Sequence, residues 1–208
     1  SKTLAMSLQW SLGLKNRASG KYITQEAFGN AVNCNGGSLR KKQKLVMIPS
    51  DDGTIHLQTH SGKFLYGDKD GKVLADVDEA SETTKWTIVP QPSGSWGLIS
   101  AAGYFFHGTG SNLTAFTEAK EGVAVPDDGH WIVHLNLHPQ INLYSPQRKC
   151  FVHFSGDALT TDEDVPWGED ALLSLVFFED SAEGRYGICS YDGRFLDQSG
   201  KLVPSKTP

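Results

Sequence analysis

The chain has few cysteines, no long apolar run and no excess of basic charge. Its 208 residues include three cysteines without clustered spacing, which argues against a disulfide framework and favours reduced thiols in a cytosolic protein. No apolar stretch approaches the ~18 residues that a membrane span needs, and the N-terminus carries no apolar signal core. The net charge of −5 argues against a general nucleic-acid binder, because counterion release requires a basic surface. We therefore expect a cytoplasmic protein with no membrane span and no nucleic-acid partner.

Signatures of catalysis and metal binding are also missing. Two of the seven histidines, His134 and His138, are four residues apart, but on a strand this spacing does not bring them to one site. Cys34 lies near basic side chains that would lower the pKa of its thiol, yet no nucleophile motif includes a histidine. We interpret the acidic run Asp162–Asp164 as a solvated loop. No Gly-rich phosphate loop joins a strand to a helix. The prediction is a protein that is not an enzyme, without catalytic residues, cofactor or metal.

The chain does have a recurring turn that leads into an aromatic residue. Gly20–Ile23 (Gly-Lys-Tyr-Ile) recurs as Gly62–Leu65 and, in looser form, around Phe105, Phe151 and Phe195. Successive aromatic positions are 42, 41, 46 and 44 residues apart. A fixed period of this kind is the signature of a repeat architecture.

Each of the first three periods holds four short apolar segments separated by turn residues. Strands of about five residues with turn signals every 8–12 residues indicate an all-β closed or sandwiched domain. Three units of four strands, each closed by a hydrophobic strand, are the pattern of a β-trefoil. One helical turn is expected at 79–84. The expected strands are 8–14, 21–24, 31–34 and 45–49, then 54–58, 63–66, 72–74 and 86–90, then 96–100, 104–106, 113–116 and 131–134.

A second set of strands begins near residue 141 and holds fewer than two repeats. The sequence therefore predicts a first β-trefoil at 8–133 and a partial second β-trefoil at 134–208. An incomplete set leaves core faces and strand edges uncovered. Either the chain is part of a longer protein or another copy of the chain fills the gap. The expected strands of this set are 141–144, 151–154, 172–178, 186–189 and 194–196.

Basic side chains are concentrated in one segment. Residues 15–44 hold seven basic side chains and one acidic one, Glu26, whereas the other residues hold 12 basic and 23 acidic groups. A local net charge of +6 on an acidic protein indicates either a surface for an acidic partner or a solvated basic turn. The seven residues are Lys15, Arg17, Lys21, Arg40, Lys41, Lys42 and Lys44.

Five motifs occur in register over about 150 residues. They are Lys21–Gly29 (KYITQEAFG), Ser38–Gln43 (SLRKKQ), Asp68–Gly71 (DKDG), His138–Asn142 (HPQIN) and Val165–Asp170 (VPWGED). In order and spacing they resemble the fascins, actin-bundling proteins built from four tandem β-trefoils. The resemblance extends from Trp10 to about Val203 and identifies the chain as roughly the N-terminal two-fifths of a fascin.

The resemblance implies F-actin as partner and a place in the cytoskeleton, in actin-rich protrusions such as filopodia. In fascins the first trefoil packs against the fourth, and basic residues near that cleft bind actin. By motif, Lys21, Arg40 and Lys42 match positions of that region, and Lys41 is their neighbour. Ser38 matches a serine whose phosphorylation by protein kinase C weakens actin binding. A phosphate adds about −1.5 to −2 charge, here within a basic cluster.

The sequence departs from the family pattern in places, and alternatives remain open. Arg40 replaces the usual Lys, and Lys44-Leu45 replaces an apolar residue and Trp; Gly36-Gly37 is expected to loosen the turn before Ser38. The C-terminal trefoils are missing from the chain, and bundling needs two separated sites on one rigid body, so we do not expect it alone to bundle filaments. A carbohydrate-binding (lectin-like) trefoil is the alternative, because a fold does not give a function. Its usual Gln-x-Trp repeat is absent from the closing strands. A trefoil acting only as an inhibitor or scaffold would leave the basic cluster unexplained.

Overall fold

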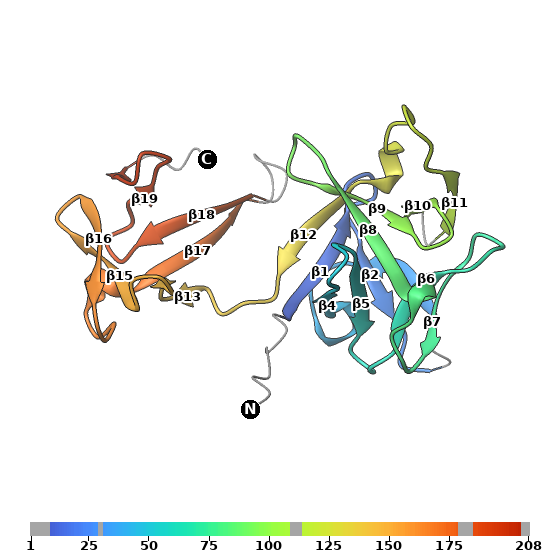
Figure 1. The fold of residues 1–208 in the computed structure, drawn as a ribbon, viewed down its shortest axis with the longest axis horizontal. Helices are drawn as coiled ribbons and strands as arrows, with labels where there is room; N and C mark the ends of the chain where they lie inside the picture. Colours follow the sequence, from blue (N-terminus) through green and yellow to red (C-terminus); the bar gives the residue numbers. More distant parts are fainter. Residues whose placement is uncertain (1–8, 29–30, 109–113, 179–184, 205–208) are drawn as a thin grey trace. The chain divides into compact units, whose positions relative to one another are not determined.

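The computed structural model describes residues 9–28, 31–108, 114–178 and 185–204. The chain divides into two compact units, Ser1–Leu137 and His138–Pro208, called unit 1 and unit 2 below (Figure 1). The boundary expected between 133 and 134 lies inside the last strand of unit 1. Leu8, Gly29 and Leu113, which belong to the segments singled out in the sequence, lie outside the described residues.

Unit 1 is built from three successive sets of four strands. The first and last strands of each set belong to a barrel, and the two middle strands form a hairpin. The observed strands lie close to the segments expected from the sequence. In the described residues they are β1 (Trp10–Asn16), β2 (Tyr22–Gln25), β3 (Val32–Gly36), β4 (Leu45–Pro49), β5 (Ile55–Thr59), β6 (Phe64–Gly67), β7 (Val73–Val77), β8 (Lys85–Pro90), β9 (Trp96–Ser100), β10 (Tyr104–His107), β11 (Thr114–Glu118) and β12 (Trp131–Leu135).

Six of these strands close a ring of antiparallel pairs. β1 pairs with β4, β4 with β5, β5 with β8, β8 with β9, β9 with β12, and β12 returns to β1. The remaining strands form the hairpins β2–β3, β6–β7 and β10–β11, one for each repeat. Closure leaves the six barrel strands without an open edge. A six-stranded barrel with three hairpins is a β-trefoil, which confirms the fold class predicted from the sequence period.

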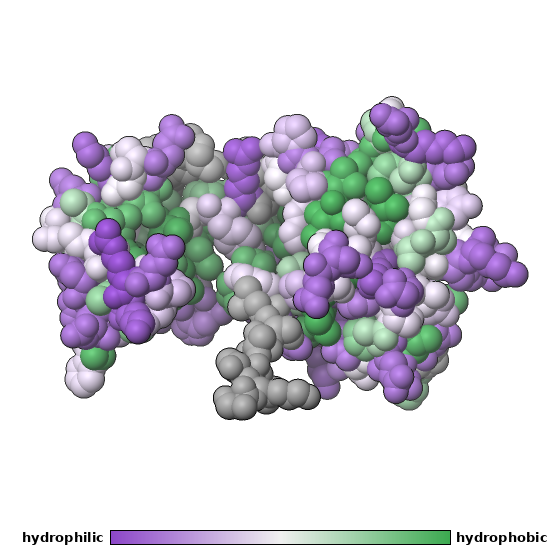
Figure 2. Space-filling view, in the orientation of Figure 1, coloured by the Kyte–Doolittle hydropathy of each residue, from purple (hydrophilic) through white to green (hydrophobic). Residues whose placement is uncertain are grey.

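The interior of the barrel is filled by equivalent residues of the three repeats. The Phe106 ring lies between the indoles of Trp86 and Trp131, with ring centroids 4.9 and 4.7 Å apart. The indole N–H of Trp86 donates to the Leu65 carbonyl, and that of Trp131 to the Phe106 carbonyl, each at 3.0 Å. The first repeat places Leu45 at the position of these tryptophans. Around this core, apolar surface gathers over β8 and β9 in the view of Figure 2.

The backbone conformation explains why the recurring turn contains glycine. Gly20, Gly62 and Gly103 have φ of 66°, 85° and 86°, in the left-handed region that glycine adopts without steric cost. Two residues later, Tyr22, Phe64 and Phe105 are buried. In the fourth copy this position is Lys149, with φ 56°. Lys149 is therefore the counterpart of Gly20.

Unit 2 forms two small sheets around a core of Phe154, Leu173 and Leu202. Phe151, the aromatic of the fourth copy, is only half-buried, and its ring lies 4.9 Å from that of exposed Tyr144. The described strands are β13 (Gln140–Ile141), β14 (Tyr144–Ser145), β15 (Cys150–Ser155), β16 (Ala158–Glu163), β17 (Leu173–Phe178), β18 (Arg185–Ser190), β19 (Phe195–Leu196) and β20 (Leu202–Val203).

The acidic run Asp162–Asp164 of unit 2 is not the solvated loop that the sequence analysis predicted. Asp162 and Glu163 belong to β16 and do not form a loop. The Asp162 carboxylate lies 2.7 Å from Nε2 of His153 in β15, and Asp170 lies 3.0 Å from Nδ1 of the same ring. The hydrogen bonds that these two carboxylates accept from the imidazole raise the pKa of His153, and the bond to Asp162 has the larger effect. A histidine across the hairpin explains why acidic side chains are tolerated in this strand.

Short 3-10 turns connect several strands. One of them, η2, ends at Thr84 and matches the helical turn expected at 79–84. Another, η1, follows Arg40 and includes Lys41 and Lys42, where no regular structure was expected. The four turns in the described residues are η1 (Lys41–Gln43), η2 (Glu82–Thr84), η3 (Asp127–Gly129) and η4 (Glu169–Ala171).

Candidate functional site

The four predicted cations lie on two connected parts of the first repeat. Lys21 immediately precedes β2, whereas Arg40 precedes η1 and Lys41 and Lys42 belong to it. All four side chains are exposed. β2 pairs with β3 so that Tyr22 lies opposite Gly36, which places the backbone of Lys21 beside the start of the segment that leads to η1. The register of one hairpin therefore brings together residues almost twenty positions apart. We call these four residues the cationic surface.

Two side chains fix the segment that carries the cations. Leu39 packs against β1, because a Cβ added at Gly13 would lie 2.5 Å from its Cδ1 atom. Gln43 is buried; its Oε1 accepts from the Arg40 backbone N–H at 3.2 Å, and its Nε2 donates to Thr24 Oγ1 at 3.0 Å. η1 is thus tied to β2 by a buried amide, so the cations are presented by a well-packed segment.

The glycine pair before Ser38 has two different roles. Gly36 is buried in β3, and a Cβ there would lie 2.7 Å from both Gln43 and Thr24. It is therefore required for packing and does not loosen the turn, in contrast to the expectation from the sequence. Gly37 faces open space, and Ser38 after it is exposed. The hydroxyl of Ser38 is thus accessible beside Arg40.

Lys42 is not a free cation. Its Nζ lies 3.0 Å from Oε2 of Glu26, and the other carboxylate oxygen of Glu26 accepts from the side-chain amide of Asn33 at 2.9 Å. The hydrogen bonds from Asn33 and Lys42 lower the pKa of Glu26. The one acidic residue of the basic segment therefore joins β2, β3 and η1.

The other three cations differ from Lys42 in their contacts. No ion pair of Lys21, Arg40 or Lys41 occurs within the part of the chain that the structure describes. The positive charge of η1 also acts on His60 in the second repeat. The pKa of His60 is lowered, first by burial and then by the charges of Lys41 and Lys42. Burial alone would disfavour a charge of either sign, so only the contribution of Lys41 and Lys42 has the sign that favours bound anionic groups.

Lys15 and Cys34, which also lie in the basic segment, have structural roles instead. The Nζ atom of Lys15 lies 5.9 Å from the centre of the Tyr22 ring, in cation–π range. The Tyr22 hydroxyl lies 2.8 Å from Nδ1 of His134. Cys34 is fully buried, and desolvation raises the pKa of its thiol to about 11. The prediction that basic neighbours lower this pKa is therefore wrong, because burial outweighs them.

The described residues contain no group of three His, Cys, Asp or Glu side chains arranged to hold a metal ion. His134 contacts Tyr22, whereas Nδ1 of His138 accepts the Gln140 backbone N–H at 3.2 Å. Within the same residues, no helix is long and apolar enough to cross a membrane. The absence of a metal or cofactor remains an expectation from the sequence.

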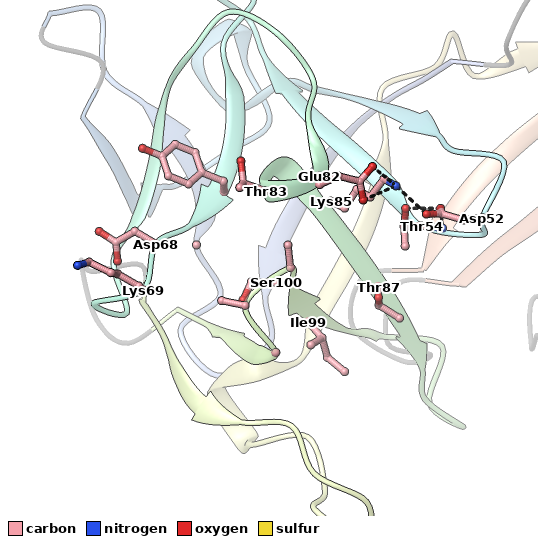
Figure 3. Close-up of a pocket in the computed structure, with 15 residues that line it drawn as sticks. Asp52, Thr54, Asp68, Lys69, Glu82, Thr83, Lys85, Thr87, Ile99 and Ser100 are labelled. Carbon is pink, nitrogen blue, oxygen red and sulfur yellow. Dashed lines mark hydrogen bonds and ion pairs between the residues drawn. The ribbon is translucent and has the colours of Figure 1, made fainter.

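A groove of about 800 Å³ lies elsewhere in unit 1, between the β6–β7 hairpin and the β9–β10 turn (Figure 3). Figure 3 shows the Lys85 ammonium between two carboxylates, and it lies 2.8 Å from Asp52 and 2.7 Å from Glu82. The bond from Lys85 holds the pKa of Asp52 well below its usual range. Asp68 accepts backbone N–H groups of its own turn, and the Tyr66 hydroxyl donates to Asp76. Asp52, Tyr66, Asp68, Glu82 and Lys85 of the groove are thus already engaged by the chain itself.

Comparison with known proteins confirms the resemblance seen in the motifs. The family model described as "Fascin domain" matches residues 19–124, about half of the chain. The chain belongs to the fascin family. Fascin-2 of Mus musculus is 37% identical to this fascin-family chain over 202 residues, which cover 94% of the chain and 39% of that protein. Fascin-2 of Homo sapiens is 36% identical over 207 residues (97% and 40%), and fascin of Strongylocentrotus purpuratus 32% over 204 (96% and 40%). The chain therefore spans about two-fifths of the length of these relatives.

Solved structures of other proteins share the fold at low sequence identity. SeviL, in a structure bound to the asialo-GM1 saccharide, matches 62% of the fascin-family chain and 100% of its own, with TM-score 0.52 and 19% identity. A BEL β-trefoil matches 61% of the chain and 92% of its own, with TM-score 0.51 and 17% identity. The designed three-fold symmetric protein ThreeFoil matches 60% and 97%, with TM-score 0.50 and 20% identity. These similarities show the β-trefoil fold alone.

Sequence reasoning missed three features of the cationic surface. Glu26 and Lys42 are 16 residues apart, and their pairing depends on the β2–β3 register, so no local sequence pattern predicts it. The buried role of Gln43 has no signal in a polar stretch of cations. Phe28 was part of a motif, but only the structure shows that its side chain is 92% exposed.

Proposed function

We propose that this fascin-family chain carries part of an actin-binding surface, within a protein that cross-links actin filaments into bundles. The observation that carries the proposal is the exposure of Lys21, Arg40 and Lys41 on one hairpin and its adjoining turn, without ion pairs in the described residues. An acidic filament is the partner that the family resemblance implies. Lys42 adds its charge to this surface, although it is shared with Glu26.

The physical argument is electrostatic complementarity. Cations on a packed segment lose little conformational freedom in their backbone on binding, and they attract an acidic polymer over about a Debye length, ~8–10 Å. Rim charges of this kind act mainly on association rate and salt dependence. We therefore expect binding that weakens steeply with ionic strength.

Ser38 is the proposed regulatory position. Its exposed hydroxyl is accessible to a kinase and lies two residues before Arg40. A phosphate there would offset one to two of the neighbouring positive charges and accept hydrogen bonds from them. The cationic surface would then lose attraction for an acidic filament.

The proposal is tested by co-sedimentation of the full-length protein with F-actin. The double variant Arg40→Glu/Lys41→Glu reverses two unpaired cations without touching the Glu26–Lys42 pair. The matched control is Lys69→Glu/Lys72→Glu, which makes the same charge change at two exposed lysines of the β6–β7 hairpin. We expect the first variant to lose most of its binding at physiological salt and the control to keep it. Equal binding of the parent and the Arg40/Lys41 variant would refute the site.

A carbohydrate-binding module is the second candidate. It is supported by the groove of about 800 Å³ and by the trefoil fold shared with a protein solved with a saccharide. It is disfavoured because Asp52 and Asp68 in the groove already accept hydrogen bonds from the chain. A glycan array with the parent and the Asp52→Asn variant separates the two functions, since only a saccharide site in the groove predicts binding that this variant abolishes.

The wider assignments belong to the same proposal. We infer a non-enzymatic protein of the cytoplasmic actin cytoskeleton, in protrusions such as filopodia. Cross-linking requires a second filament site on the same rigid body, contributed by further trefoils or by another copy of the chain. A low-speed sedimentation assay, which pellets bundles but not single filaments, tests that step.

A further inference from the structure

Phe28 is an unusual side chain for the surface of a folded domain. Its ring is 92% exposed, the largest exposed fraction among the apolar side chains of unit 1 that the structure describes. It lies after β2 in a loop closed by the Glu26 backbone N–H, which donates to the Ala31 carbonyl at 2.8 Å. An exposed apolar side chain of this size gains free energy when a partner covers it.

The position of Phe28 connects it to the cationic surface. Glu26, two residues earlier, is the residue that binds Lys42 of η1. Two residues of chain span at most about 7 Å, so the Cα atom of Phe28 lies within that distance of the Cα atom of Glu26, whose side chain forms the ion pair. Glu26 therefore takes part in both contacts: its backbone N–H binds the Ala31 carbonyl, and its carboxylate binds Lys42 of η1.

We propose that Phe28 is an apolar anchor of the filament-binding surface, which inserts into an apolar depression on the acidic face of the filament beside the partners of Lys21, Arg40 and Lys41. This inference rests on the proposed function and names a contact that charge alone does not supply. Interfaces commonly combine a few buried aromatic anchors with a charged rim that steers association. The cations then determine the dependence on salt, and Phe28 contributes a part of the affinity that salt does not screen.

The two contributions are separable by experiment. Co-sedimentation with F-actin is measured at several salt concentrations for the full-length parent, Phe28→Ser, Phe28→Leu and Arg40→Glu/Lys41→Glu. We expect Phe28→Ser to weaken binding about tenfold at every salt concentration with an unchanged salt dependence. Phe28→Leu, which keeps an apolar side chain, is expected to retain most of the affinity. The charge variant is expected to bind weakly and to show a flatter salt dependence.

Each outcome decides one claim. Parent-like binding of Phe28→Ser together with loss in the charge variant would overturn the anchor and leave the proposed function in place. Parent-like binding of the charge variant would overturn the proposed function itself. The thermal midpoint of Phe28→Ser is expected to match that of the parent, because an exposed ring stabilises nothing in the free protein. A lowered midpoint would show that Phe28 packs within the intact protein, and it would also overturn the anchor.

Discussion

Glu26 and Lys42 form an ion pair with 3.0 Å between Oε2 and Nζ, and this contact joins the end of β2 to η1. Both side chains are about half exposed, at 40% and 47%, so the pair is worth little for the stability of the fold. Its effect is positional. The pair offsets the charge of one of the four cations and connects Glu26, two residues before Phe28, to η1.

Neutralising Glu26 is expected to strengthen filament binding. Glu26→Gln keeps an oxygen for the Asn33 amide but releases Lys42, so the cationic surface gains one unit of charge. We expect about two- to fivefold tighter co-sedimentation at low salt, within the range of a single exposed charge, and a steeper loss with added salt. The neutralisation Glu79→Gln, at an exposed acid after β7, is the control. Unchanged affinity for Glu26→Gln would mean that Lys42 does not meet the filament.

A negative charge at Ser38 is expected to act in the opposite direction. Ser38→Asp places a carboxylate two residues from Arg40, and we expect roughly tenfold weaker filament binding with an unchanged thermal midpoint. Ser38→Ala should bind as the parent does. The control is Ser155→Asp, which adds the same charge at an exposed serine of unit 2. If the two Asp variants bind equally, the effect comes from net charge and not from the position of Ser38.

The stability of unit 2 is expected to fall as pH rises past neutral. The pKa of His153 is raised in the folded state, chiefly by its hydrogen bond to Asp162. Its stabilisation is therefore fully present below the unfolded pKa, about 6.5, and is lost as pH rises through the higher folded pKa. We expect unfolding of unit 2 at lower denaturant concentration at pH 8.5 than at pH 6.

The variant His153→Gln isolates this effect. It keeps a hydrogen-bonding side chain but cannot carry the charge, so the difference between the two pH values should shrink. The matched variant His138→Gln, at an exposed histidine of the same unit, should retain it. A pH dependence that is the same in all three proteins would assign it to other groups.

The barrel is expected to depend on the indole hydrogen bonds of its closing strands. Trp131→Phe leaves the Phe106 carbonyl without its donor in a fully buried site. An unpaired buried polar group costs about 1–3 kcal/mol, and the smaller ring adds a packing loss. Denaturant unfolding monitored by circular dichroism measures the change. Trp96→Phe, at a half-buried tryptophan of β9, should have a clearly smaller effect.

The repeat was readable from the sequence because its physical causes are local. A turn that needs a left-handed residue favours glycine, and the following aromatic enters the core, so Gly20, Gly62 and Gly103 recur together with the ring that follows. The fourth copy is harder to recognise in the sequence because Lys149 adopts a similar, left-handed φ without being a glycine. The β16 strand was missed because its outward side chains are polar and acidic, and its partner in β15 is not visible from its own residues.

The cationic surface could be predicted only in part, because the contacts of its residues are not local in the sequence. A count of charges located the basic segment, but charge counting does not show which cations are already paired. The Lys42 partner comes from across a hairpin, and the burial of Cys34 depends on how β3 packs on the barrel. Resemblance supplied candidate residues, whereas the three-dimensional register determines their neighbours.

The stacking of Trp86, Phe106 and Trp131 has an optical consequence. Two indoles deep in the barrel, both donating hydrogen bonds to carbonyls, should emit at short wavelength and resist quenching by acrylamide. Trp167 of unit 2, which is 88% exposed, should emit at long wavelength with ready quenching, and its emission should change little on unfolding. The short-wavelength part of the intrinsic fluorescence therefore belongs to the barrel of unit 1, and a denaturant titration can follow the loss of that barrel without any added label.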